Sequence, residues 1–461
     1  MKGLPRSQAL LIGLLMSASS SAWSADETPQ QMGDLPFAAE IITYEVRHKA
    51  TAQGGYGPED SLLGADYEGF YSLRYEPTFI WYSPEKRWPR WQVQIRGALA
   101  FDSSSATTPL QEEDRQQQVE GTYAQLSEFY VQRNLLGDDP RFALTVGRQR
   151  FSDRQGLWWD DTLEAVRFSY NDSFARGFVA AGQKFAYYNT DVNALEPGDE
   201  QIFYALGEYA WRWRNQHWAG VRLLYEHDHS GRSLDDPNDF TGYRYGVFAS
   251  ADGIQSPWLS DYHIELAAVQ GERETFTQFG AANTDIQGWA LLTELGKRFD
   301  DLPWQPRLVL RTGLTDKPGA DSEGFYLNQI QSDRLVNPLT YSTRLVSSFV
   351  RLDIRNLAYF GMGVEFQPTA RTSLDARVSQ LWLRNRESDL PIRTNTTQNI
   401  NSSNLGQVLD LTYYWQSFPL AYRGRHFDMN ILLSGSYFRA GSATGDLDND
   451  YQLSLGIVMR Y

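Results

Sequence analysis

The stretch WQVQIRGALAF, residues 91–101, decides the fold because it alternates between two kinds of side chain almost without a break. One parity carries the apolar residues Trp91, Val93, Ile95, Leu99 and Phe101. The other parity carries glutamines, alanines and Arg96. A period of two is typical of a β-strand with an apolar face and a polar face. This stretch therefore predicts a wall with lipid or core on one side and water on the other.

Composition and length favour a single domain without a thick hydrophobic core. The chain has 461 residues, 14 % of them aromatic, and it is hydrophilic on average. We find no linker, composition break or exact repeat between residue 40 and the end. Apolar residues spread over every second position fit a membrane β-barrel better than a thick core. We expect one domain at residues 25–461.

The first 24 residues are predicted to be a secretory signal peptide. Lys2 and Arg6 precede an apolar run from Ala9 to Met16, and small residues follow. The run is too short for a membrane-spanning helix. The chain contains no cysteine, which excludes a disulfide scaffold and thiolate chemistry. We expect export to the bacterial outer membrane.

The rhythm of alternating segments predicts the fold class: an all-β, closed antiparallel transmembrane β-barrel of about 18 strands. The connections alternate between short ones, such as residues 83–90, 171–176 and 367–372, and long ones, such as 102–121 and 316–345. Short periplasmic turns and long extracellular loops are typical of such barrels. The last segment, YQLSLGIVMRY, ends on an aromatic residue, as expected at a membrane interface. The strands are expected near residues 40–50, 70–82, 91–101, 122–134, 141–151, 163–170, 177–187, 201–213, 218–227, 242–250, 261–270, 287–298, 306–315, 349–366, 372–383, 406–416, 427–438 and 450–461.

Applied to the cleanest strands, the alternation predicts which charged side chains face the lumen. The basic set is Arg74, Arg96, Arg307, Arg311, Arg351, Arg355 and Arg377, and the acidic set is Glu76, Glu265, Asp353 and Asp375. This wall is net basic, although the whole chain has a formal charge of -15. Arginine suits carboxylates, and rings of basic residues are used in anion pores. The alternative is that these arginines only brace the barrel by pairing with neighbouring acids.

One stretch resembles a known family. GRQRFSDRQGLWWDDTLEAVRFSY, residues 147–170, is similar to the corresponding part of the alginate export family of outer-membrane porins. The likeness continues through SEFYVQ (127–132), AGQKFAYYNTD (181–191) and RLDIRNL (351–357). The resemblance implies a monomeric barrel of about 18 strands. It also implies an arginine-rich constriction that passes the polyuronate alginate.

Carried over by position, the resemblance assigns several residues to the pore. It implies that Arg148 and Arg150 of the GRQR run line the pathway, Arg150 as a constriction arginine. Arg74 and Arg351 match two more arginines, and the acids that match are Glu128, Asp160 and Asp191. The sequence departs from the family pattern at Ser127 and Leu432, where the family has arginines, and at Tyr187, where it has an acid. The periplasmic connection at 416–426 is also shorter than the one that acts as a plug in better-known members.

The alternation and the resemblance disagree at one place. Phe142, Leu144 and Val146 share parity with Arg148 and Arg150, which would then face lipid at a cost of roughly 2–4 kcal/mol each at mid-bilayer. Either a bulge near Gly147 turns the arginines inward, or they lie beyond the hydrocarbon.

Other functions find weaker support. His227 and His229 lack a third spaced metal ligand, and Asp446, Asp448 and Asp450 lack the glutamate that would complete a calcium loop. The motifs of serine hydrolases, zinc peptidases and P-loop enzymes are absent from the sequence. We interpret WWDD at 158–161 as part of the pore mouth. The sequence predicts no enzyme, no cofactor and no metal.

The sequence thus predicts a passive outer-membrane channel for an anionic, alginate-like polysaccharide or oligosaccharide. The partners expected are membrane lipid, the saccharide and periplasmic export or uptake proteins, with no nucleic acid, and the channel is expected to be a monomer. A general or small-anion porin is the first alternative. A soluble secreted saccharide-binding protein or lyase is the second.

Overall fold

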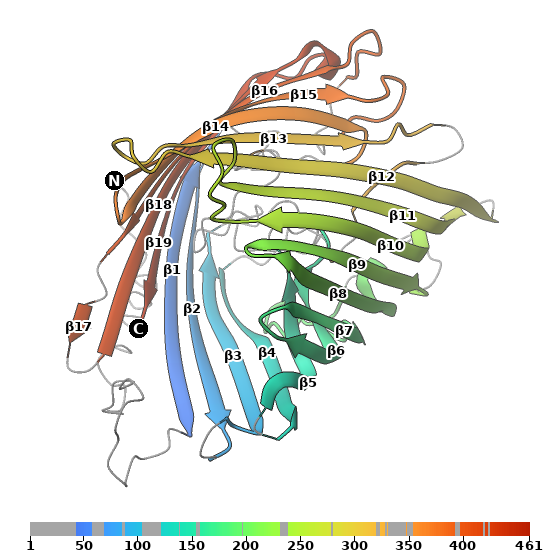
Figure 1. Cartoon of the computed structure of the whole chain (residues 1–461). Helices are drawn as coiled ribbons and strands as arrows, with labels where there is room; N and C mark the ends of the chain where they lie inside the picture. Colours follow the sequence, from blue (N-terminus) through green and yellow to red (C-terminus); the bar gives the residue numbers. More distant parts are fainter. Residues whose placement is uncertain are drawn as a thin grey trace.

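The computed structural model is a closed β-barrel (Figure 1). It describes residues 43–57, 69–84, 88–103, 121–137, 139–153, 157–195, 197–230, 238–277, 280–319, 323–327, 330, 347, 354–391, 397–417, 420–422 and 425–461. Its strands are β1 (Tyr44–Tyr56), β2 (Gly69–Tyr82), β3 (Trp91–Asp102), β4 (Gly121–Leu136), β5 (Asp139–Ser152), β6 (Asp160–Asn171), β7 (Ala175–Gln183), β8 (Ile202–Arg214), β9 (His217–Asp228), β10 (Asn238–Ala251), β11 (Asp261–Thr277), β12 (Gly280–Arg298), β13 (Arg307–Thr315), β14 (Leu357–Thr369), β15 (Thr372–Leu383), β16 (Asn404–Gln416), β17 (Leu420–Tyr422), β18 (Arg425–Ala440) and β19 (Asp450–Arg460).

Antiparallel pairing closes the barrel. Apart from β16 and β17, each strand pairs with the next along the chain, and β1 pairs with both β2 and β19, so that the last strand lies beside the first (Figure 1). The short β17 pairs only with β18, while β16 pairs with β18 directly. The described residues thus form 19 strands, of which 18 make the ring. This confirms the predicted fold class and excludes two stacked sheets.

The connections lie as predicted at the two ends of the barrel. The start of β1 and the end of β19 lie at the same end of the barrel, where the amide of His48 donates to the carbonyl of Tyr461. The short connections, such as residues 172–174 and 215–216, mostly lie at this end, which we call the turn end. The longer ones lie at the opposite loop end, where β11 and β12 are also joined by a short connection. Termini and short turns of outer-membrane barrels are periplasmic. No helix among the described residues is long and apolar enough to span a membrane.

The two faces of the wall follow the predicted alternation. On β3, Ile95 and Leu99 are exposed on the outer face, whereas Ala98 and Ala100 are buried on the inner face. Exposed apolar side chains likewise lie two residues apart on other strands, such as Tyr209 and Trp211 on β8, Tyr243 and Tyr245 on β10, and Phe360 and Met362 on β14. Because a barrel of this size leaves a water-filled lumen unless something enters it, the inner residues and the loops decide what passes.

One predicted strand begins later in the described part of the chain than expected. The segment expected at 349–366 becomes β14 only at Leu357, because residues 354–356 form a bend in which Asn356 has a φ of 53°. Asparagine tolerates this left-handed conformation, which is not that of a regular strand. Arg355 therefore precedes the strand instead of facing the lumen from it. Arg351 and Asp353 lie outside the described residues.

Candidate functional site: the lumen and the segments that enter it

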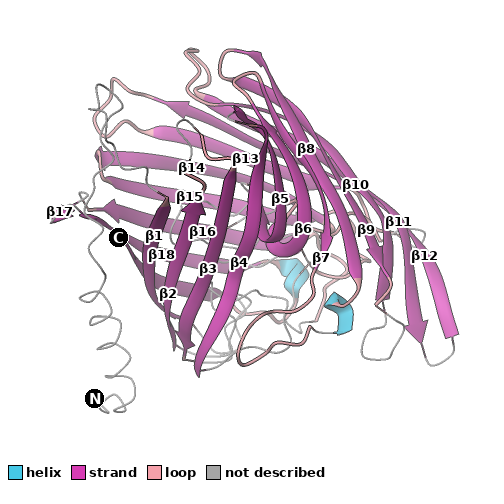
Figure 2. Cartoon of the chain, turned by 90° about the horizontal axis from the view of Figure 1, so that it is seen from below, coloured by secondary structure: helices cyan, strands magenta, loops and turns pink. Residues whose placement is uncertain are grey.

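The hairpin of β5 and β6 leaves the wall at Gly147. Below this point β5 pairs with β4 as far as Phe129 and Arg148, and the two strands then separate. Gly147 has a φ of 126°, and an added Cβ would overlap the backbone of Phe129. Glycine adopts this conformation without strain. We call the described residues of 148–163 the inner hairpin, because they bend into the barrel (Figure 2).

The place that β5 leaves beside β4 is taken by residues 184–190, which we call the crossing segment. The amide of Leu126 donates to the carbonyl of Tyr188, and the amide of Thr190 donates to the carbonyl of Ala124, at 3.0 and 2.9 Å. Residue Gln125 forms a bridge with Asn189. The strand predicted at 177–187 therefore ends at Gln183, because the chain crosses from β7 to β4 there.

Arg148 is buried beneath the crossing segment and does not face lipid. Its Nη1 lies 2.6 Å from Glu164 Oε1 and also donates to the carbonyl of Ala186. Its Nε donates to the carbonyl of Leu126, and its guanidinium lies 4.7 Å from the ring centre of Tyr188. The predicted turn at Gly147 is thus present. The alternation had placed Arg148 toward lipid and the resemblance had placed it in the pore. This conflict disappears because the crossing segment covers the outer side of the hairpin.

The Arg148–Glu164 pair gives a stability prediction. Replacing Arg148 with alanine leaves the buried Glu164 carboxylate without its charge partner, so unfolding should become easier by about 3–5 kcal/mol. Urea unfolding in lipid vesicles measures the change. Replacing both residues, Arg148→Met with Glu164→Gln, should recover most of the loss. Breaking the exposed Arg141–Asp139 pair with Arg141→Ala is the control, and an equal loss there would contradict the prediction.

The tip of the inner hairpin is dry and aromatic. Trp158 and Trp159 are 1 % and 2 % exposed and pack with inward side chains of β8 to β12, including Leu206, Leu224 and Val269. The interpretation of this stretch as pore mouth is therefore wrong, since these rings lie among side chains of the inner wall. The indole Nε1 of Trp158 donates to Glu265, whose carboxylate also accepts from Arg222 at 2.5 Å.

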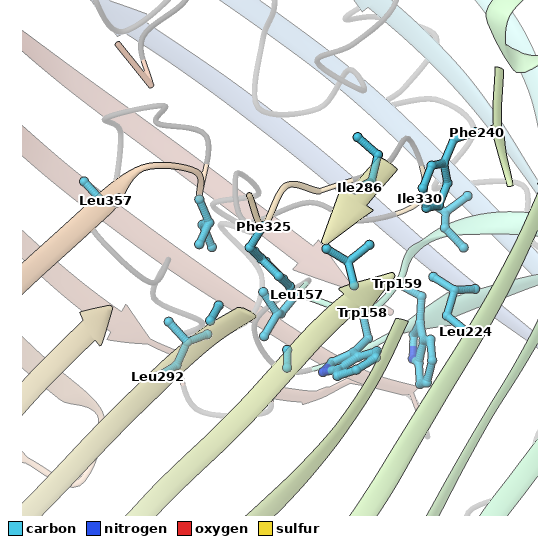
Figure 3. Close-up of a cluster of buried hydrophobic side chains, with 14 of the residues drawn as sticks. Leu157, Trp158, Trp159, Leu224, Phe240, Ile286, Leu292, Phe325, Ile330 and Leu357 are labelled. Atoms are coloured by element: carbon cyan, nitrogen blue, oxygen red, sulfur yellow. The ribbon is translucent and has the colours of Figure 1, made fainter. Parts of the chain in front are cut away.

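The connection between β13 and β14 contributes a second segment to the same cluster (Figure 3). Phe325 and Ile330 are each 1 % exposed, and the amide of Asp160 donates to the carbonyl of Ile330 at 2.7 Å. The carbonyl of Tyr326 accepts from Arg244, and the Tyr326 ring lies within 4.7 Å of the guanidinium carbons of Arg244 and Arg273. Burial raises the pKa of the Tyr326 hydroxyl. The two connections therefore meet inside the barrel.

Two glycines of the inner wall make room for these segments. A Cβ at Gly246 would touch the indole of Trp158, and a Cβ at Gly288 would overlap the backbone of Phe325. Any larger residue at Gly288 would push residues 323–327 away from the wall. Sequence patterning did not identify this role, because glycine inside a strand also marks bulges.

A first group of predicted pore residues lies on β1 to β4. Arg74 Nε lies 3.4 Å from Glu76, and Arg74 Nη2 donates to Gln125 at 3.2 Å. Arg96 Nη2 lies 2.6 Å from Glu128. Lys49, which the sequence analysis did not select, also pairs with Glu76. These side chains come together because the even positions of β2 and β3 and the odd positions of β1 face the lumen.

A bulge on β4 orients the acid of this group. Arg96 pairs in register with Glu128, but the next residue, Gly97, pairs with Leu126, so Ser127 is the extra residue. Both Ser127 and Glu128 are buried as a result. A β-bulge shifts the alternation by one position, which brings Glu128 to the lumen side beside Arg96.

A second group lies on β11 to β15. Arg307 contacts Asp261, Glu294 and Glu365 at 2.5, 3.1 and 2.7 Å. Arg311 lies 2.8 Å from Glu294, and Arg377 lies 2.8 Å from Asp375. All three arginines are less than a tenth exposed. This group braces neighbouring strands.

The remaining predicted residues are spread around the barrel. Arg150 pairs with Asp160 across the inner hairpin. Asp191 is exposed just after the crossing segment, and its amide donates to Asn189. Arg355 lies 3.4 Å from Asp389 and 4.0 Å from Glu323 at the loop end. Of the positions where the sequence departs from the family pattern, Leu432 faces inward and Tyr187 is buried, donating to Asp199.

The balance of lumen charge differs from the count made on the sequence. Each predicted pore arginine among the described residues has an acid within 4.0 Å. Acids that the count did not include, such as Glu128, Glu294 and Glu365, supply many of these partners. The arginines differ in how much water reaches them: Arg96 and Arg150 are 29 % and 33 % exposed, whereas Arg377 is 2 % exposed. Among the arginines on the strands, the more open ones therefore lie on the β1 to β6 side, and Arg355 at the loop end is 30 % exposed.

The described part of the chain contains no arrangement of side chains suited to binding a metal ion. No group of three or more histidine, aspartate or glutamate side chains there is placed to hold an ion. His227 and His229 stack on each other with ring centres 5.2 Å apart. The carboxylate of Asp450 accepts from the amide of Tyr451.

Comparisons with known proteins agree with this architecture. The family model described as alginate export matches residues 42–453. The alginate production protein AlgE of Pseudomonas aeruginosa is 24 % identical over 484 aligned residues, which cover 96 % of this chain and 94 % of that protein. AlgE of Pseudomonas syringae pv. tomato is 30 % identical over 211 residues, covering 41 % of this chain and 42 % of that protein.

Solved structures show the same fold. Pseudomonas aeruginosa OccK2 (OpdF), crystallised in complex with glucuronate, aligns with a TM-score of 0.56 and 9 % identity over 90 % of this chain and 97 % of that chain. OpdK with vanillate aligns at 0.53 with 10 % identity, over 90 % and 98 %. A porin-like barrel of this kind lies in the outer membrane. The protein described here is therefore an outer-membrane β-barrel that belongs to the alginate export family.

Proposed function

We propose that this protein is a passive outer-membrane channel for an anionic, alginate-like polysaccharide. The chain acts by conduction and not as an enzyme, crosses the membrane as a monomer, and receives its substrate from periplasmic proteins or delivers it to them. Residues 1–24 direct export and residues 25–461 form the barrel. Membership of the alginate export family supports the substrate class.

The observation that carries the proposal is the group on β1 to β4. Arg74, Arg96 and Lys49 project into the lumen from neighbouring strands, and two of them, Arg96 and Lys49, remain more than a quarter exposed. Glu76 and Glu128 fix the positions of these cations without covering them. A sugar carboxylate can then exchange with the fixed acids at each step, which gives binding that is favourable but easily released. A general small-anion porin needs no such series of cationic side chains.

Ion selectivity tests the role of this group. We expect Arg74→Gln with Arg96→Gln to move the reversal potential under a KCl gradient toward cation preference, because Glu76 and Glu128 keep their charges. Glu76→Gln with Glu128→Gln should move it the opposite way. Planar bilayers measure both shifts. Identical reversal potentials in the two double variants would mean that these arginines do not set selectivity.

Transport itself requires a separate measurement. Vesicles containing the protein should release entrapped oligouronates faster than neutral oligosaccharides of the same length. The release of both at equal rates would favour the general porin. No release of oligouronates, with normal ion currents, would contradict the proposed substrate.

A further inference from the structure

Three side chains at the turn end of the lumen form a cluster apart from the two arginine groups. Arg176 on β7, Arg212 on β8 and Trp218 on β9 occupy even positions, which face inward on these strands, as buried Ala180, Ala210 and Leu224 show. In register, Arg176 lies opposite Ala210, and Trp218 lies opposite Arg212. Ala210 and Gly220 separate the larger side chains, so Arg176 can extend across β8 to the indole on β9.

Aromatic rings hold both arginines. The guanidinium carbon of Arg176 lies 4.9 Å from the ring centre of Trp218. That of Arg212 lies 4.8 Å from the ring centre of Phe174, which belongs to the β6–β7 turn. A guanidinium stacked on a ring keeps its N–H donors free at its edge, whereas one paired with a carboxylate has used several of them. These two arginines are therefore positioned by rings, while Arg176 is exposed and Arg212 is half-buried.

No acid neutralises this cluster among the residues that the structure describes. The nearby acids on the same strands have other partners: Glu208 lies 2.8 Å from Arg222, and Asp172 accepts from Ser173 and from Tyr170. Arg176 and Arg212 differ in this respect from Arg74, Arg96 and Arg307. Each of those three arginines has a carboxylate within 3.4 Å. The cluster carries two uncompensated positive charges at the mouth of the lumen.

The spacing suits a ligand with repeated carboxylates. Because Arg176 lies opposite Ala210, Arg212 is its diagonal neighbour, and such positions are roughly 7–8 Å apart in a sheet. Long flexible arginine side chains can close or widen this separation to meet successive acidic sugars. Charges at a pore mouth also raise the rate at which oppositely charged solutes arrive.

We propose that Arg176, Arg212 and Trp218 form a docking site for the carboxylates of an acidic saccharide at the periplasmic mouth of the channel. The inference rests on the proposed function for its ligand class. The docking site acts before the arginines on β1 to β4, capturing the chain from the periplasm. Arg176 and Arg212 bind carboxylates, and Trp218 fixes the orientation of Arg176.

Side-specific block of single channels tests the docking site. Sodium oligogalacturonate is added to one side of a planar bilayer at a time, and the rate and duration of current blocks are recorded at several salt concentrations. For Arg176→Gln with Arg212→Gln, we expect the block rate from the turn side to fall roughly threefold to tenfold, with a weaker salt dependence. The rate from the loop side should not change. Trp218→Leu keeps both charges, so it should shorten the blocks more than it slows their onset.

Arg133 offers a matched control. It stacks on Trp91 at 5.1 Å near the same end, but both residues share the parity of the outer, lipid-facing side. Arg133→Gln should leave block from either side unchanged. Heat-dependent migration on a gel verifies that each variant has folded.

The outcomes separate the two proposals. A wild-type channel that is blocked from the turn side but releases no oligouronate from vesicles would contradict the proposed function and support the docking site. A double variant that behaves like wild type, or that loses block equally from both sides, would overturn the docking site and leave the proposed function standing. A wild-type channel that neither conducts nor is blocked by oligouronates would overturn both.

Discussion

Replacing Trp158 and Trp159 with alanine is expected to raise single-channel conductance several-fold. The two rings fill the lumen beside β8 to β12 and pack in the same buried cluster as Phe325 and Ile330 (Figure 3). Their loss opens space to water and frees the hairpin tip, because Glu265 also loses its bond from the indole of Trp158. The variant should also unfold more easily, since removing a buried tryptophan side chain costs about 3–5 kcal/mol. Planar-bilayer recordings in KCl measure the conductance.

A tryptophan on the outer face separates this effect from a general loss of packing. Trp213 is 55 % exposed on the outer face of β8, and Trp213→Ala should leave conductance unchanged. Heat-dependent gel migration confirms that each barrel is closed. If the double variant folds and conducts like wild type, the inner hairpin does not limit the passage.

Cross-linking Ser347 of the β13–β14 connection to Ser436 on β18 is expected to stop polysaccharide passage while preserving small-ion current. The hydroxyls of Ser347 and Ser436 lie 3.3 Å apart, and both donate to Asp410. A disulfide needs its sulfurs about 2 Å apart, so Ser347→Cys with Ser436→Cys requires only a small adjustment. Since the chain has no cysteine of its own, the new pair is unique. Oligouronate release should cease on oxidation and return after reduction.

A second engineered pair controls for the presence of a disulfide. The hydroxyls of Ser402 and Ser442 lie 2.6 Å apart between two loop-end connections. Ser402→Cys with Ser442→Cys should form a cross-link that leaves oligouronate release unaffected. Equal release from oxidised and reduced Ser347→Cys, Ser436→Cys protein would show that this connection can stay fixed during transport.

The alternation of side chains predicted most of the fold. It placed nearly every strand within a few residues, because lipid on one side and water on the other impose a strict period of two. Exceptions of two kinds occur. The strands expected at 261–270 and 287–298 are each seven residues longer, because β11 and β12 stay paired as far as Thr277 and Gly280. The others occur where the chain leaves the wall. Asn356 adopts a left-handed conformation before β14, and β7 ends at Gln183 because the crossing segment begins there.

The lumen was less predictable than the wall. Parity shows that Arg96 faces inward, but only the register of β3 against β4, with its bulge at Ser127, shows that Glu128 meets it. Similarly, Arg307 pairs with acids on β11, β12 and β14, which are far apart in sequence. Pairing across strands depends on register, which local patterning does not encode.

The inner hairpin shows the same limit in another form. The sequence presents Arg148 and Glu164 at outward positions, and nothing near either residue indicates what covers them. Their cover comes from Ala186 and Tyr188, beyond the following strand. The resemblance in residues 147–170 indicated a special site there, and Gly147 was the local signal of the turn. Only the three-dimensional structure shows which segment covers them.

From the crossing segment we expect a definite order of assembly. Residues 184–190 occupy the edge of β4 that β5 would otherwise continue along, so they can bind there only after the inner hairpin has turned away. The hairpin must enter the barrel before this seam closes, because no free edge remains afterwards. A folding intermediate halted before that step would expose an unpaired strand edge, the kind of surface that chaperones must shield from aggregation.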